Sequence, residues 1–150
     1  MSDRSGARSP DRAEELFYTA FETGDIDTMA GIWAQSEEIV CVHPNGPQLV
    51  GYGRIMQSWR SILENTAGFR VSVRLIHHYV DGNIAVRFVN ETLINERSDA
   101  PPVTVLATNA YRRTGSGWQM VLHHASPAPR GGEPDDDADT DAPAGSVTLH

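Results

Sequence analysis

The first part of the chain carries apolar residues with the period of an α-helix. Ser9 suits an N-cap, Pro10 suits the first helical position, and Gly24 suits the left-handed residue that ends a helix. Between these signals, apolar residues recur at spacings of three and four: Ala13, Leu16, Phe17, Ala20 and Phe21. The pattern predicts an amphipathic helix that begins after Ser9 and stops at Gly24.

Two more helices are expected before residue 65. Asp25 can cap a short helix with Met29, Ile32 and Trp33 on one face. A third helix, over 52–64, has a longer apolar stripe made of Ile55, Met56, Trp59, Ile62 and Leu63. The run EEIVCVHPNGPQLVG lies between them, and its β-branched residues, broken by Pro and Gly, predict two short strands joined by a turn.

After residue 68 the hydrophobic period changes from helical to alternating. Strands are predicted over 69–80, 84–95, 103–113 and 118–126, with a hairpin turn at Asp81-Gly82-Asn83. In the first of them, alternation puts six residues on one face: Phe69, Val71, Val73, Leu75, His77 and Tyr79. Helices followed by an antiparallel meander predict an α+β fold, with three N-terminal helices packed on the concave face of a curved antiparallel sheet.

Composition separates the two ends from this domain. Residues 1–8 are polar, and residues 128–150 combine Pro, Gly and acidic side chains with little apolar surface to bury. Such segments do not offset their ordering entropy by burial, so both are expected to be disordered. A single domain over 9–127 remains.

Charge and residue usage narrow the possible functions. The chain has 20 acidic and 12 basic side chains, a net charge of -8, which disfavours a nucleic-acid partner. All the cations are arginine, so lysine Schiff-base chemistry is excluded. A single cysteine, Cys41, permits no internal disulfide and suits a reducing compartment. No apolar run has the length of a signal peptide or a membrane span, so we expect a cytoplasmic protein without membrane partners.

Three segments, in this order, resemble the SnoaL-like branch of the nuclear transport factor 2-like superfamily: AFETGDIDTMAGIW, VCVHPNGPQLVGYGRIMQSW and LATNAYRRTGSGWQMVLHHAS. The last is also similar to the end of the association domain of the calmodulin-dependent kinases. The resemblance covers residues 10–127 and implies a cone (cystatin-like) fold, with a pocket between the helices and the concave sheet face. It also implies a homodimer formed through the convex face. The superfamily includes isomerases, dehydratases, ligand carriers and association modules, so the fold does not select a function.

Three polar residues are candidates for catalysis in such a pocket. His43 ends the first short strand, where its imidazole could exchange a proton or only cap the HPNG turn. Alternation puts His124 on the same strand face as Trp118, Met120 and Leu122, so His124, rather than His123, is predicted to face the pocket. A bulge would exchange the two histidines. Asn109, in the neighbouring strand, could orient a carbonyl ligand or a histidine.

Aromatic residues could form the walls for a flat ligand, although the same spacing is typical of core residues: Tyr18, Trp33, Trp59 and Tyr111. Glu91 would be a general base if it is buried alone, but an ion pair with Arg87, or exposure on the convex face, is favoured. The Asp base and the Tyr/Asp pair of ketosteroid isomerases are missing. Histidine spacing gives no support for a metal site, and no cofactor is expected.

Three interpretations follow. The chain is an isomerase or dehydratase in which His43 or His124 moves a proton beside a carbonyl held by Asn109. Alternatively, it is a non-catalytic module that binds a small apolar or aromatic molecule, or an association module whose pocket is filled by its own side chains. Dimerisation is expected under each, because the strands carry apolar residues on both faces.

Overall fold

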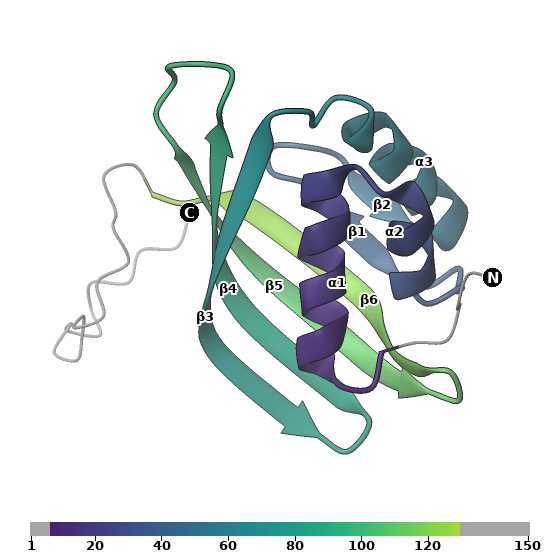
Figure 1. Ribbon diagram of the computed structural model, residues 1–150. Coiled ribbons are helices and arrows are strands. Elements are labelled where there is room, and N and C mark those ends of the chain that lie inside the picture. Colours follow the sequence, from purple (N-terminus) through teal and green to yellow (C-terminus); the bar gives the residue numbers. More distant parts are fainter. Residues whose placement is uncertain (1–6, 130–150) are drawn as a thin grey trace, which may run out of the picture.

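The computed structural model describes residues 7–129 (Figure 1). The two tails expected to be disordered therefore lie mainly outside the described residues, in 1–6 and 130–150. At the N-terminal side, Ala7 pairs with Trp118 through two backbone hydrogen bonds of 3.2 and 2.8 Å. A β-bridge is thus present two residues before the predicted helix cap at Ser9.

The three predicted helices are present: α1 (Pro10–Thr23), α2 (Ile26–Ile32) and α3 (Tyr52–Leu63). The Ser9 hydroxyl accepts a hydrogen bond from the Arg12 amide, and the Asp25 carboxylate accepts one from the Thr28 amide. Gly24 ends α1 with a φ of 71°, a left-handed conformation that glycine adopts at little cost. Local capping chemistry therefore sets the helix boundaries.

Six strands form one sheet in the order β2-β1-β6-β5-β4-β3. Their bounds are β1 (Val40–Val42), β2 (Gln48–Val50), β3 (Phe69–Asp81), β4 (Ile84–Asn95), β5 (Val103–Thr114) and β6 (Gly117–Pro127). The last four form the predicted antiparallel meander. The sheet is nevertheless mixed, because β1 pairs in parallel with β6. The helices lie on one side of the sheet, and the long strands bend around α1 (Figure 1).

Two bulges interrupt the strand alternation. In β3, Leu75 pairs with Val89 and His77 pairs with Phe88, so Ile76 is an extra residue. The predicted single face from Phe69 to Tyr79 is therefore wrong beyond Leu75. In β6, Met120 pairs with Tyr111 and Leu122 pairs with Ala110, so Val121 is the extra residue. Residues after each bulge point to the face opposite to the one that simple alternation gives.

The hydrophobic core lies between the helices and the concave face of the sheet. Phe17 from α1, Ile55 from α3 and Val89 from β4 are each 0% exposed. Within residues 7–129, no helix has both the length and the apolar composition needed to cross a bilayer.

Candidate functional site

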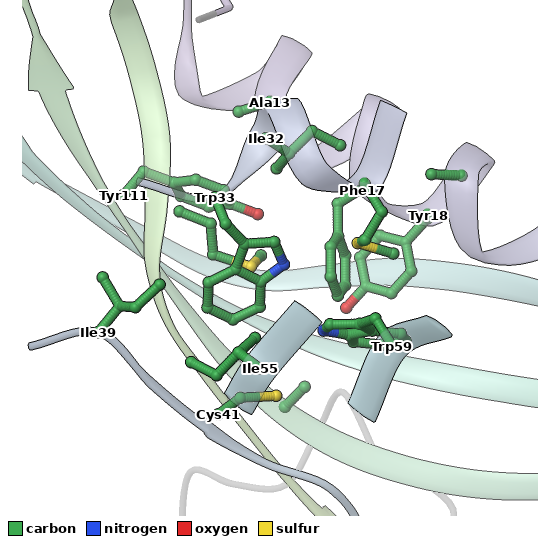
Figure 2. Close-up of a cluster of buried hydrophobic side chains, with 14 of the residues drawn as sticks. Ala13, Phe17, Tyr18, Ile32, Trp33, Ile39, Cys41, Ile55, Trp59 and Tyr111 are labelled. Carbon is green, nitrogen blue, oxygen red and sulfur yellow. The ribbon is translucent and has the colours of Figure 1, made fainter. Parts of the chain in front are cut away.

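One half of the cone interior is aromatic (Figure 2). The Phe17 ring lies at its centre, with ring centroids at 4.8 Å from Tyr18 and 5.4 Å from Trp59 in edge-to-face arrangements. Trp33, Trp59 and Tyr111 are at most 2% exposed. The structure thus places the predicted aromatic wall in the packed core, where Tyr18, Trp33 and Trp59 each contact the Phe17 ring.

The other half of the interior is a polar network that begins at Glu14. This α1 side chain is 5% exposed, and its Oε2 accepts a hydrogen bond of 2.7 Å from Arg87 Nε on β4. Its other oxygen, Oε1, accepts from the Tyr111 hydroxyl at 2.9 Å and from Asn109 Nδ2 at 3.1 Å. Arg87 also contacts Asp11 at 2.6 Å. The buried carboxylate is therefore paired and hydrogen-bonded, as a charge in a core requires.

Glu91 lies next to this network but has no cationic partner among residues 7–129. Its side chain is 4% exposed, and its Oε2 accepts a hydrogen bond of 2.5 Å from the Tyr18 hydroxyl. Asn109 Nδ2 donates to the same hydroxyl oxygen at 3.0 Å. Arg87, which the sequence suggested as the partner of Glu91, pairs with Glu14 and Asp11 instead. The favoured expectation for Glu91, an ion pair or an exposed position, is therefore wrong.

Burial without a countercharge changes the acidity of Glu91. Desolvation raises its pKa to about 7, and the Glu14 charge acts in the same direction, while the Tyr18 hydrogen bond lowers the pKa and offsets part of this rise. Burial also raises the pKa of Tyr18 well above that of free tyrosine, so Tyr18 remains a phenol that donates. A carboxyl group with a pKa close to neutrality can take up and release a proton at physiological pH.

The buried histidine of β6 is His123, not His124. His123 is 3% exposed, and its Nδ1 lies 2.6 Å from Asn109 Oδ1. His124 is exposed on the convex face, opposite Thr108. The prediction that His124 faces the interior is wrong because the bulge at Val121 reverses the alternation. Burial lowers the pKa of His123 to about 3, with His43 and His124 contributing in the same direction, so its imidazole is neutral.

His43, from the end of β1, lies beside the aromatic half. Its ring is 4.9 Å from that of Trp59, and its Nε2 is 2.8 Å from Ser58 Oγ on α3. Burial lowers the pKa of His43, which makes it neutral at pH 7. The rings of His43 and His123 are 6.5 Å apart. The structure therefore brings His43, Asn109 and a β6 histidine to one region, with His123 in the place predicted for His124.

A surface groove of about 350 Å³ runs between α1 and the edge strand β3. Val71, Val73 and Leu75 form an apolar side, and Asp11, Glu15 and Glu22 are the exposed carboxylates that line it. Glu14, Tyr18 and Arg87 also line this groove. The buried network is thus reached from the surface on the side of α1. Within residues 7–129, no three His, Cys, Asp or Glu side chains are placed to share a metal ion.

The sequence pattern did not indicate Glu14 as a site residue, and it predicted His124 rather than His123 to face the interior. Glu14 follows Ala13 on the buried face of α1, and an acid on an apolar helix stripe is the signal that could have identified it. Its partner Arg87 is 73 residues away, and nothing in the sequence links the two. The bulge at Val121 has no glycine or proline to mark it.

Helices on the concave face of a bent six-stranded sheet, with polar groups buried between them, define a cone-type α+β domain. Residues 12–130 match the SnoaL-like domain. The chain therefore belongs to the SnoaL-like family.

Two solved structures are similar in both sequence and fold. A proposed calcium/calmodulin-dependent protein kinase type II association domain from Thiobacillus denitrificans is 38% identical, with a TM-score of 0.76; the match covers 81% of this chain and 97% of that one. A proposed dehydratase of the NTF2-like family from Streptomyces avermitilis is 32% identical, with a TM-score of 0.70; this match covers 79% and 93%. The two names belong to different functional classes.

A curated relative also matches over part of its length. F-box protein SKIP8 of Arabidopsis thaliana is 27% identical over 110 residues, which are 73% of this chain. The match spans 46% of that protein, less than half of its length.

Proposed function

We propose that this protein is an acid–base catalyst of the isomerase or dehydratase type, acting without a cofactor on a small carbonyl compound. The observation that carries the proposal is the buried Tyr18-Glu91 pair, in which Glu91 is 4% exposed and no cationic partner lies within the part of the chain that the structure describes. Leaving an acid unpaired in a core destabilises a fold, and such arrangements are concentrated at functional sites. Glu91 would move the proton, and Tyr18 would remain its hydrogen-bond partner.

The groove between α1 and β3 supports this function, because Tyr18 lines the groove and also holds Glu91. A volume of about 350 Å³ falls at the lower end of the range for small-molecule sites, which is roughly 300–1,000 Å³. The apolar side chains of Val71, Val73 and Leu75 would take a carbon skeleton. The surrounding carboxylates disfavour anions, so the substrate class is neutral or cationic. The resemblance to a proposed dehydratase agrees with this chemistry.

Exchange with solvent deuterium tests the proposal without a known substrate. A panel of small neutral ketones and hydroxyketones is incubated with the protein in D₂O, and loss of the proton next to the carbonyl is followed by NMR. We expect catalysed exchange for at least one compound, with a rate that rises through pH 7 as Glu91 ionises. Glu91→Gln should lower that rate by roughly 10²–10⁴-fold.

Glu96→Gln is the matched control, because it makes the same chemical change at an exposed position just after β4, where Glu96 pairs with Arg70. It should retain the full exchange rate. Equal rates in the wild type and Glu91→Gln, or exchange of no compound above the rate in buffer, would show that the proposal is wrong.

A second proposal is self-association through the convex sheet face. Tyr79, Ile84 and Phe88 are 54%, 39% and 37% exposed, and the helices cover the other face of the sheet. The strand register places Phe88 between His77 and Thr108, and the next row contains Val86 and Leu122. A continuous apolar area of this kind is typical of an interface. The likeness to a proposed association domain supports a homodimer.

Light scattering coupled to size-exclusion chromatography tests this second proposal. The wild type is expected to elute with the mass of a dimer, and Phe88→Glu with that of a monomer, because a charge at the centre of the face would be desolvated. Val50→Glu is the control, since Val50 is 54% exposed but lies on β2 at the far edge of the sheet. A monomeric wild type, or a Phe88→Glu variant that stays dimeric, would rule out this interface.

A further inference from the structure

The hydrogen-bonding state of His123 follows from a chain of contacts that starts at Glu14. The ion pair with Arg87 holds Glu14 as a carboxylate, which only accepts hydrogen bonds. Asn109 lies 3.1 Å from Glu14 Oε1, so the amide nitrogen of Asn109, and not its oxygen, must face this carboxylate. The reverse orientation would bring two acceptors together.

The contact with Tyr18 independently fixes the orientation of the Asn109 side-chain amide. The Tyr18 hydroxyl gives its only proton to Glu91, and its oxygen therefore accepts from Asn109 Nδ2 at 3.0 Å. Both protons of the Asn109 amide are then used. Its oxygen, Oδ1, points to His123 Nδ1 at 2.6 Å and accepts, so Nδ1 of His123 carries the proton.

We propose that the contacts from Glu14 through Asn109 lock His123 in the Nδ1-protonated tautomer, which leaves Nε2 as an uncharged hydrogen-bond acceptor for the ligand. Within residues 7–129, no group donates a hydrogen bond to Nε2. The ring lies among those of Phe17, Trp59 and His43, at centroid distances of 5.0, 6.1 and 6.5 Å. Asn109 is a positioning residue, and His123 determines specificity.

This assignment narrows the ligand class and, in that respect, rests on the proposed function. A neutral imidazole nitrogen accepts from O–H or N–H and repels an oxyanion or a carboxylate. His123, buried and neutral, does not supply a proton, whereas Glu91 can. The ligand is therefore an uncharged carbonyl compound with a hydroxyl or amide N–H close to the carbonyl. The hydroxyl or N–H of such a compound would donate to His123 Nε2.

Long-range ¹H–¹⁵N correlation NMR of uniformly ¹⁵N-labelled protein reads the tautomer directly. We expect His123 to have a protonated Nδ1 and an unprotonated Nε2 between about pH 5 and pH 8. A protonated Nε2, a tautomer mixture, or an imidazolium at pH 5 would contradict the assignment. Because this NMR measurement needs no turnover, its outcome does not depend on the outcome of the deuterium-exchange test.

Asn109→Ser tests the relay of contacts from Glu14 through Asn109 to His123. The substitution removes the acceptor for His123 Nδ1, so it should convert His123 to a tautomer mixture. Asn65→Ser, at an exposed position, is the matched control and should leave the His123 signals unchanged. If Asn109→Ser does not fold, Glu14→Gln serves instead, since its amide no longer forces the Asn109 orientation. An unchanged tautomer in the variant that folds would rule out the relay.

Hydroxyacetone and methoxyacetone test the ligand class, because only the first can donate a hydrogen bond. We expect hydroxyacetone at millimolar concentration to shift the His123 Nε2 resonance and methoxyacetone to leave it in place. Equal shifts from both compounds, or from neither, would rule out His123 as the acceptor for the ligand.

Discussion

Two groups of side chains share the interior of the cone. The aromatic group around Phe17 is held by contacts without fixed direction, whereas the polar group around Glu14 is held by directional hydrogen bonds between specific atoms. Both are almost completely shielded from water. Burial therefore has two different consequences in this interior. The aromatic group stabilises the fold, whereas the polar group holds the Glu91 carboxyl group away from water without a countercharge, which destabilises the fold.

The largest effect is expected in the aromatic group. Phe17→Ala should lower the free energy of unfolding by about 3–5 kcal/mol, since Phe17 is 0% exposed and contacts three other rings of the core. Urea denaturation followed by tryptophan fluorescence measures this loss. Phe21→Ala, on the same helix but only half-buried, should cost less. A loss below about 1 kcal/mol for Phe17→Ala would show that the interior is not packed as described.

In the polar group, replacing Glu91 should instead raise the free energy of unfolding at pH 8. The pKa of Glu91 is about 7 in the folded chain and 4.5 in the unfolded chain, so the folded state keeps its proton to higher pH. Stability is therefore lost as pH rises from 4.5 to 7, and the total loss is roughly 3 kcal/mol. Glu91→Gln should be more stable than the wild type by up to about this amount at pH 8 and equal to it at pH 4.

Thermal unfolding of the two proteins at pH 4, 6 and 8 measures this difference. His123 titrates over an overlapping range with the opposite effect, since its lowered pKa gives stability above pH 6.5 that is lost toward pH 3. Because folded His123 is neutral at pH 6 and 8, its contribution is the same in the two proteins at these pH values and cancels in the comparison. A variant that is no more stable at pH 8 would mean that Glu91 is not buried as an uncompensated acid.

Tyr18→Phe should have a smaller effect that separates the roles of the two groups. The ring stays packed beside Phe17, but Glu91 loses its donor at 2.5 Å, which costs about 1.5–3 kcal/mol at pH 8. Because that hydrogen bond lowers the pKa of Glu91, its removal should raise this pKa further. Carbon-detected NMR titration of the carboxyl group measures the change. Tyr79→Phe, measured in the Phe88→Glu background so that the proposed convex-face interface is absent, should leave both quantities unaltered.

The smallest effect is expected at His124. In the Phe88→Glu background, in which the proposed convex-face interface is absent, the His124 side chain is exposed, so His124→Ala should change the free energy of unfolding by less than about 0.5 kcal/mol. Urea denaturation of His123→Ala and His124→Ala, measured side by side, gives the contrast. A loss above 1 kcal/mol for His124→Ala would place His124, rather than His123, in the interior.

The sequence predicts most of this fold because its elements have local boundaries. Ser9, Asp25 and Gly24 act within one turn of the helices that they cap, and the alternating strands follow one another as hairpins. The parallel contact between β1 and β6 was not predicted, since it joins residues about 80 positions apart.

The candidate site was predicted less well, because its geometry depends on two features that leave no local pattern. Strand alternation locates a side chain only as far as the next bulge, and the extra residues Ile76 and Val121 each reverse it. The choice of Arg87 between Glu14 and Glu91 depends on how α1 lies across β4. For Asn109, the sequence left two roles open, orienting a carbonyl ligand or orienting a histidine; the structure places Asn109 beside His123 on the neighbouring hairpin strand.

The extra residue at Val121 also bears on how relatives of this chain should be aligned. Two adjacent histidines offer the same chemical group to both faces of β6, and the count of residues between Met120 and Leu122 decides which one is internal. Loss of the single codon for Val121 would exchange the internal and external positions of the two histidines without a substitution at either one. In this family, therefore, an aligned histidine column does not identify an equivalent site unless the insertions before it are aligned as well.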